Sequence, residues 1–231
     1  MFFVIRVINL FVFLHKIIPM NRLFLFFAMA AMLFTACKKY ESPSSGGDTP
    51  LPHHIDPVYH VGDYFRNDTL EGVVFLTYGA HNGLMVSLEE VQLPWCVPNY
   101  LNSETGATNP FDGWCNTNIV MSNYDLDRFP ALQWSHQRNT WHMVYYNYRL
   151  ITANQWFVPS SGEMSKLLQN QEAVNATLDS LGYPTLEDKV YWSSTETGTR
   201  GAAAVRMQDG QIVINDSVKS QAFYVRAVRN F

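Results

Sequence analysis

The chain has 231 residues, with 16 Lys or Arg against 20 Asp or Glu, a formal net charge of −4 and 14% aromatic residues. This length suits one domain with enough chain to bury a substantial core. Because the first 36 residues hold three basic and no acidic residues, the remainder is more acidic still. An acidic surface repels a phosphate backbone, so composition argues against a nucleic-acid partner.

Residues 1–36 have the layout of a secretory signal. Arg22 supplies the positive region, and 23–34 is an uncharged apolar run followed by two small residues. This run of twelve is shorter than the roughly 20 residues that a membrane-spanning helix needs. Cys37 follows in a setting that resembles a bacterial lipobox. We therefore predict that Cys37 is lipidated and begins the mature chain.

Two further boundaries concern the same end of the chain. Residues 1–19 are also apolar, and Met20 is a cleaner start for the signal, so Met20 is the expected true start. The alternative is a two-part membrane anchor, broken at Pro19, that is never cleaved. Residues 37–58 are rich in Pro, Ser and Gly, which predicts an unpacked tether that leads into a domain over 59–231.

The domain opens with two β-rich runs, 72–78 and 83–91, separated by a short turn-like segment. Asn82-Gly83 is typical of a hairpin turn, because these residue types accept a positive φ. Residues 92–114 contain several Pro and Gly residues and predict an irregular loop.

Helical patterns occupy the middle of the domain. Residues 116–139 are weakly helical and interrupted at Pro130, whereas 156–182 carry the clearest helical signal. Ser160 and Glu163 have the spacing of a capping box, in which each side chain satisfies the backbone N–H of the other residue.

The last part of the chain returns to strands, with Asp209-Gly210 as a second hairpin signal. The predicted strands lie at 190–194, 202–207, 211–215 and 222–231. Strands at both ends with helices between them predict an α+β domain whose terminal strands pair in one sheet.

The stretch "YWSSTE" at 191–196 places hydroxyls beside a carboxylate. Ser193 and Ser194 lack the GxSxG turn of a hydrolase nucleophile, and no base is identifiable. We interpret the stretch as framework: a strand with Tyr191 and Trp192 on opposite faces, whose hydroxyls bond neighbouring loops.

Two other chemistries are conceivable from residue types. Glu163 and Glu196 could form a carboxylate pair for glycoside cleavage, although helix capping already explains Glu163. His and Asp residues, which can bind zinc, occur at the edge of the tether, but no second cluster of such residues completes a site. We therefore interpret them as solvated residues of the linker. These residues are His53, His54, Asp56 and His60. We predict no metal and no cofactor, since an EF-hand loop and a glycine-rich phosphate cradle are also missing from the sequence.

Cys96 and Cys115 are the cysteines that remain after Cys37. In a chain exported to an oxidising compartment, they predict a disulfide that stabilises the intervening loop by about 3 kcal/mol. The alternative is two reduced thiols buried separately.

Aromatic, amide and carboxylate side chains gather in the loop sequence around these cysteines. Flat rings can stack on the apolar face of a sugar while amides and carboxylates bond its hydroxyls. Residues 94–120 are therefore the predicted ligand-binding loops, and packing around the two cysteines is the open alternative for the two tryptophans. The candidate residues are Trp95, Asn99, Asp112, Trp114 and Asn116.

The order of the motifs across 59–231 resembles a known family. The motifs are "GVVFLTYGAHNGLMVSLEEV", "DGWCNTNIV", "PALQW", "WFVPSSGEMSKLL", "YWSSTE" and "FYVRAVRNF". They resemble the DUF1566 family, related to the C-terminal domain of a Legionella collagen-like adhesin, and are similar to surface domains of Bacteroidota and Fibrobacter. The resemblance implies a C-type-lectin-like fold with paired first and last strands, and the adhesin relative implies glycan or glycosaminoglycan binding.

Two features of such relatives have no match in this chain. The tripeptides of calcium-dependent lectins are missing, with Val97-Pro98-Asn99 as the nearest sequence, so no calcium–sugar site is expected. No Cys follows Cys115, so the oxidase activity of formylglycine-generating domains is not expected either. An anionic glycosaminoglycan would need a local cluster of arginines, for which the candidates are Arg200, Arg206, Arg226 and Arg229.

These features predict a non-enzymatic, lipid-anchored binding module of the cell envelope. Its expected partners are a glycan, matrix or host ligand and, through the lipid, the outer membrane on either face. The alternatives are an envelope enzyme acting on polysaccharide, or a structural subunit of a surface assembly without a small ligand.

Overall fold

The computed structural model describes residues 57–68, 70–139, 144–146, 149–151 and 155–231. The predicted signal, the lipidation site Cys37 and nearly all of the tether lie outside these residues, as do His53, His54 and Asp56. Among the described helices, none has the length and apolar character to cross a membrane.

The secondary structure follows the predicted order of strands, helices and strands. The strands are β1 (Tyr64–Arg66), β2 (Glu71–Thr77), β3 (Gly83–Val86), β4 (Val91–Pro94), β5 (Val144–Tyr146), β6 (Arg149–Ile151), β7 (Val190–Glu196), β8 (Gly201–Gln208), β9 (Gln211–Val218), β10 (Ala222–Val225) and β11 (Val228–Asn230). The helices are α3 (Gly113–Asn123), α4 (Pro130–Gln137), α5 (Ser161–Gln169) and α6 (Gln171–Ser180), with short 3-10 turns η1 (Pro98–Tyr100) and η2 (Leu126–Arg128).

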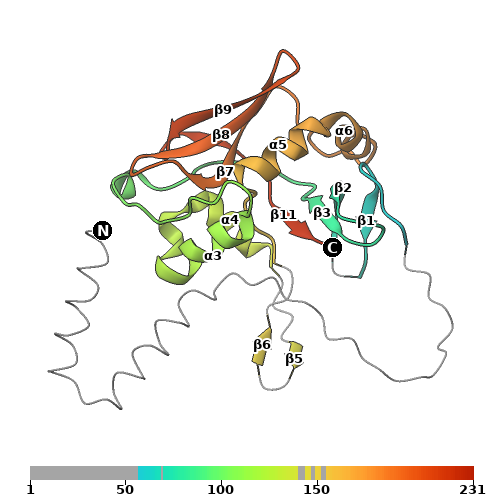
Figure 1. The fold of residues 1–231 in the computed structure, drawn as a ribbon, viewed down its shortest axis with the longest axis horizontal. Helices are drawn as coiled ribbons and strands as arrows, with labels where there is room; N and C mark the ends of the chain where they lie inside the picture. Colours follow the sequence, from blue (N-terminus) through green and yellow to red (C-terminus); the bar gives the residue numbers. More distant parts are fainter. Residues whose placement is uncertain (1–56, 69, 140–143, 147–148, 152–154) are drawn as a thin grey trace, which may run out of the picture. The chain divides into compact units, whose positions relative to one another are not determined.

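Two sheets organise the domain (Figure 1). One has the strand order β1-β2-β3-β11 and the other β4-β10-β7-β8-β9, while β5 and β6 form a separate antiparallel pair. The terminal strands β1 and β11 share a sheet, but the prediction that they pair is wrong: β11 pairs with β3, with Asn230 opposite Leu84, and β1 pairs with β2 at the other edge. The α+β class is therefore confirmed.

The first predicted hairpin is confirmed as the β2–β3 pair, but its details differ. The run 83–91 is not one strand: β3 ends at Val86, and β4 begins at Val91 in the other sheet. Gly83 does not have a positive φ. It is needed for space, because a Cβ there would lie 2.1 Å from the carbonyl oxygen of Leu76. The second hairpin follows the prediction, with φ of 49° at Asp209 and 74° at Gly210.

Arg226 occupies the break where the chain passes from one sheet to the other. β3 and β4 pair with β11 and β10 respectively, and the pairing is interrupted at 87–90 and 226–227. The fully buried guanidinium of Arg226 donates to the carbonyls of Ser87 and Leu88, at 2.7 and 2.6 Å, and to the carboxylate of Glu90 at 3.0 Å. It thereby satisfies backbone acceptors that the interrupted pairing leaves without a partner.

Helices cover both faces of the β4-β10-β7-β8-β9 sheet. Helix α5 contacts β7, β8 and β2, and its buried leucines join a core that includes Tyr191. Helices α3 and α4 contact β7 and β4 respectively, and Trp192 lies in the second core. Tyr191 and Trp192 therefore point to opposite faces of the sheet, as predicted.

Local signals place most helix ends. Ser160 and Glu163 form the predicted capping box at α5, and Asn170 separates α5 from α6 within the predicted helical segment. Helix α3 begins earlier than predicted, at Gly113, because Asp112 caps it by accepting from the N–H of Cys115. Pro130 does not interrupt a helix but begins α4, where the lack of an N–H is tolerated.

Candidate ligand-binding surface

The hydroxyls of "YWSSTE" connect β7 to neighbouring segments. Ser193 and Ser194 are fully buried, and the Ser193 hydroxyl donates to the carbonyl of Ala203 at 2.7 Å. The Thr195 hydroxyl accepts from the N–H of Ser161 and donates to the carbonyl of Asn109. The framework interpretation of this stretch is confirmed, since its hydroxyls tie α5 and the 105–110 loop to the sheet.

Glu196 and Lys219 form a buried ion pair that holds the same loop. Lys219 Nζ lies 2.5 Å from Glu196 Oε1 and also donates to the carbonyls of Ser103 and Thr199. The Glu196 carboxylate accepts from the N–H groups of Thr105 and Gly106. Lys219 is fully buried, and Glu196 is buried at the end of β7. The loop that precedes α3 is thus fixed by charge-assisted hydrogen bonds.

The predicted Cys96–Cys115 disulfide is wrong, because no bond joins these two buried thiols. Cys96 follows β4 and packs in the core beside Trp95, where burial raises the pKa of its thiol. Cys115 lies in the first turn of α3, where its N–H donates to Asp112. The loop between the two cysteines is bonded instead to the carboxylate of Glu196 through the N–H groups of Thr105 and Gly106.

Two of the five candidate ligand residues are internal. Trp95 is fully buried, packs edge-on against Phe129 with ring centroids 5.5 Å apart, and donates its indole N–H to the carbonyl of Ser193. Asn116 is also fully buried and exchanges hydrogen bonds with the backbone of Asn109. Trp95 and Asn116 therefore pack inside the domain against the 94–120 segment, and neither is available to a ligand.

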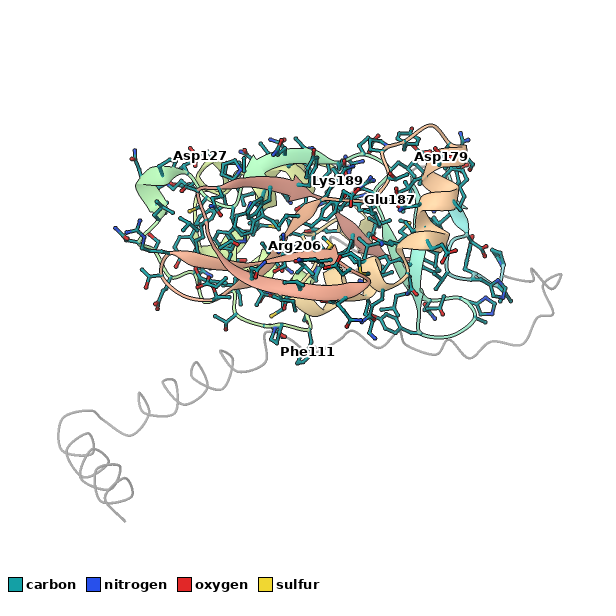
Figure 2. All side chains as sticks on the ribbon, turned by 90° about the horizontal axis from the view of Figure 1, so that it is seen from above. Phe111, Asp127, Asp179, Glu187, Lys189 and Arg206 are labelled. Atoms are coloured by element: carbon teal, nitrogen blue, oxygen red, sulfur yellow. The ribbon has the colours of Figure 1, made fainter. Side chains whose placement is uncertain are left out.

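The other three candidates lie nearer the surface. Asn99 is exposed in η1, and Asp112 is half-buried as the cap of α3. Trp114 is 39% exposed, and Phe111, which the sequence-based prediction missed, is 81% exposed. Figure 2 shows Phe111 projecting from the body of the domain. Phe111 and Trp114, on either side of the cap residue Asp112 and Gly113, are called the α3 aromatic surface below.

The exposure of Phe111 has a local cause. An apolar residue just before a helix cap commonly packs against the fourth residue of the helix, forming a hydrophobic staple. That fourth residue in α3 is Asn116, which is buried and already bonded to Asn109. The apolar contact of a staple is therefore not available to Phe111 at that position, and its ring lies near Gly162 at the start of α5.

Tyr78 follows β2 in the chain and is 58% exposed. Partial burial raises the pKa of its phenol, and the charges of Glu163 and Asp112 raise it further. The fold thus puts Tyr78 within electrostatic range of the first turns of α3 and α5, although these segments are distant in the sequence.

Glu163 joins the first turns of α3 and α5. Its Oε2 accepts from the N–H of Ser160 at 2.8 Å and from the N–H of Gly113 at 3.0 Å. Gly113 is required here, since a Cβ would lie 2.6 Å from that oxygen. Glu163 and Glu196 are each bonded to backbone N–H groups of different segments, so both carboxylates have structural roles that explain their positions.

The stability contributed by Glu163 is expected to depend on pH. Burial raises the pKa of its carboxyl above the ordinary value near 4.3, although the bonds to Ser160 and Gly113 oppose this shift. A raised pKa means that the folded state binds more protons, so this contribution is lost as pH rises through the folded pKa. Glu163→Gln should remove that loss. Denaturant unfolding of both proteins from pH 4 to 8 should show the parent chain losing stability relative to the variant; a constant difference would contradict it.

The four candidate arginines do not form one exposed cluster. Arg226 is fully buried in the break between the sheets, and burial lowers the pKa of Arg229. Among the described residues, no group of His, Cys, Asp and Glu is arranged to hold a metal ion. His60 is exposed, and its N–H donates to Asp63.

No family model and no curated protein matches the sequence. Among solved structures, a fimbrial protein from Bacteroides ovatus ATCC 8483 is similar, with a TM-score of 0.50 and 20% sequence identity. The likeness is one of fold. It covers 64% of this chain and 36% of that chain, so this chain spans only part of the length of the fimbrial protein.

Proposed function

We propose that this domain is a cell-envelope subunit of adhesion type that binds a glycan, or a matrix or host component, through the α3 aromatic surface. The observation that carries the proposal is the 81% exposure of Phe111 on an ordered support. Fully burying a Phe side chain contributes roughly 1.5–3 kcal/mol, which this fold leaves unused. A ligand that covers the ring would gain much of that stabilisation.

The support beneath the rings suits recognition. Asp112 and Glu163 fix the start of α3, and the Lys219–Glu196 pair fixes the loop before it. A surface held in one conformation loses little entropy when it binds, which favours affinity. The half-buried carboxylate of Asp112, next to Phe111 in the chain, can also accept from a sugar hydroxyl, whereas it would repel a sulfated or carboxylated chain. The favoured ligand is therefore a neutral glycan.

Three further parts belong to this proposal. The likeness of fold to a bacterial fimbrial protein supports a surface role. The motif order that resembles DUF1566 supports a C-type-lectin-like fold with ligand contacts in irregular loops. Lipidation at Cys37 would attach the chain to the envelope membrane.

Removal of the two exposed rings tests the proposed surface. The purified protein should bind a subset of neutral glycans on an array, and the double variant Phe111→Ala, Trp114→Ala should weaken binding at least tenfold, which is about 1.4 kcal/mol. Leu181→Ala is the matched control, because it removes a 37% exposed apolar side chain at the end of α6. Binding that survives the double variant would place the ligand elsewhere, and a silent array would count against a glycan ligand.

The same purified protein also tests the two alternative functions, a structural subunit and a polysaccharide-acting enzyme. A structural subunit without a small ligand would leave the array silent and still assemble with other chains. A polysaccharide-acting enzyme would release shortened sugars from a glycan that binds, a product detectable by chromatography. Neither alternative requires the exposed ring of Phe111.

A further inference from the structure

β9 forms the outer edge of the five-stranded sheet, at the upper rim of the domain in Figure 1. Across the described residues, β8 is the only strand that pairs with it. β9 is eight residues long, contains neither Pro nor Gly, and has one charged residue, Asp216. Edge strands usually carry several charges, a Pro or a bulge that prevents pairing with another chain, and β9 lacks these features.

The hairpin turn determines which backbone groups of β9 point outward. The two-residue turn Asp209-Gly210 makes Gln208 and Gln211 a hydrogen-bonded pair. Hydrogen-bonded and non-bonded pairs then alternate along an antiparallel ladder. Ile212, Ile214 and Asp216 consequently direct both N–H and C=O away from β8. This edge offers donors and acceptors to an added strand.

The side chains next to these groups are also suited to pairing. Ile212, Ile214 and Val218 lie on one face of β9, where Ile214 is 52% and Val218 42% exposed. Asp216 is on the same face, but its carboxylate accepts from the hydroxyl of Thr197 at 2.5 Å and is directed back to the domain. The charge of Asp216 therefore does not prevent another strand from pairing with the edge of β9.

We propose that two copies of this chain associate through β9, which pairs antiparallel with β9 of the second copy and joins the two sheets. The strand is complementary to itself. A two-fold axis at Ile214 sets Ile214 opposite Ile214, and an axis at Asn215 sets Ile212 opposite Val218. In neither register does Asp216 face Asp216, so like charges are not opposed. Closed two-fold dimers are also the commonest symmetric assemblies.

The oligomeric state of the full chain tests this pairing. The protein mass in detergent, measured by light scattering with the detergent contribution subtracted, should show a dimer whose population rises with concentration. Ile214→Lys should raise the dissociation constant at least tenfold if the two-fold axis lies at Ile214, and Asn215→Lys should do so if it lies at Asn215, because each change then brings two ammonium groups together at the axis. Leu181→Lys introduces the same charge at a similarly exposed apolar residue away from β9, and it should leave the dimer unchanged.

Cross-linking gives a second readout that does not depend on tolerance of a charge. Ile214→Cys or Asn215→Cys should form a disulfide between copies above the level of the parent chain, whereas Ser180→Cys on α6 should not. A chain that stays monomeric, a dimer insensitive to both Ile214→Lys and Asn215→Lys, or cross-linking only through Ser180→Cys would overturn the proposal. Phe111→Ala should not alter the dimer, so failure of self-pairing and failure of glycan binding are distinguishable.

Discussion

Replacing Lys219 by Met is expected to lower the free energy of unfolding by about 3–5 kcal/mol, the range for breaking a buried ion pair on one side. The variant keeps an aliphatic side chain over the ring of Trp95, where Lys219 Nζ lies 5.0 Å from the centroid. It leaves the Glu196 carboxylate buried without its cation and the carbonyls of Ser103 and Thr199 without their donor. Urea unfolding followed by Trp fluorescence would measure the loss.

Two comparison variants separate charge from packing. The double variant Lys219→Met, Glu196→Gln removes both charges and should recover part of the loss, because Gln can still accept from the N–H of Thr105. Lys166→Met removes an exposed lysine on α5 and should change stability by less than about 0.5 kcal/mol. If Lys219→Met behaves like Lys166→Met, the loop before α3 is not held by this pair.

Arg226→Met is expected to have a loss of similar size, about 3–5 kcal/mol, for a related reason. Its guanidinium donates to three backbone carbonyls, those of Ser87, Leu88 and Pro184, and to Glu90. Each buried acceptor that loses its donor costs about 1–3 kcal/mol. Glu90 keeps partners in Lys189 and Tyr191, which limits the total. Denaturant unfolding monitored by circular dichroism would give the value.

The geometry of the guanidinium provides the control for this second variant. Arg226→Lys retains the charge but cannot reach several carbonyls from one planar group, so its stability should fall between those of the parent and Arg226→Met. Arg200→Met, at an exposed position, should be close to neutral. An Arg226→Lys protein as stable as the parent would show that only the charge opposite Glu90 matters.

Much of the local structure could be predicted because its causes are local. The Ser160–Glu163 capping box, the Asp209-Gly210 turn and the alternation of Tyr191 and Trp192 each depend on residues a few positions apart. The order of strands, helices and strands followed from the same patterns, and so did the presence of both terminal strands in one sheet, since a sheet face or helix stripe must bury itself against another element.

The candidate site was predicted less well, because the same residue types serve as support and as surface. Trp95 and Trp114 look alike in sequence, yet one is fully buried and the other 39% exposed. Phe111 gave a weak signal only: an apolar residue before a helix whose fourth residue is polar. Tyr78 gave none, because it follows β2, far from α3 in the sequence, and only the fold puts it within electrostatic range of Asp112.

By itself the sequence determined the α+β class, the order of strands, helices and strands, the capping box of α5 and the framework role of 191–196, since short-range sterics and hydrophobic periodicity act within one segment. Tertiary structure alone decided that Arg226 fills the break between the sheets, that Lys219 pairs with Glu196 against a loop about 90 residues away, and that Cys96 and Cys115 remain thiols. These outcomes depend on which distant groups share a water-free interior, where an unpaired charge or carbonyl is too costly to leave without a partner.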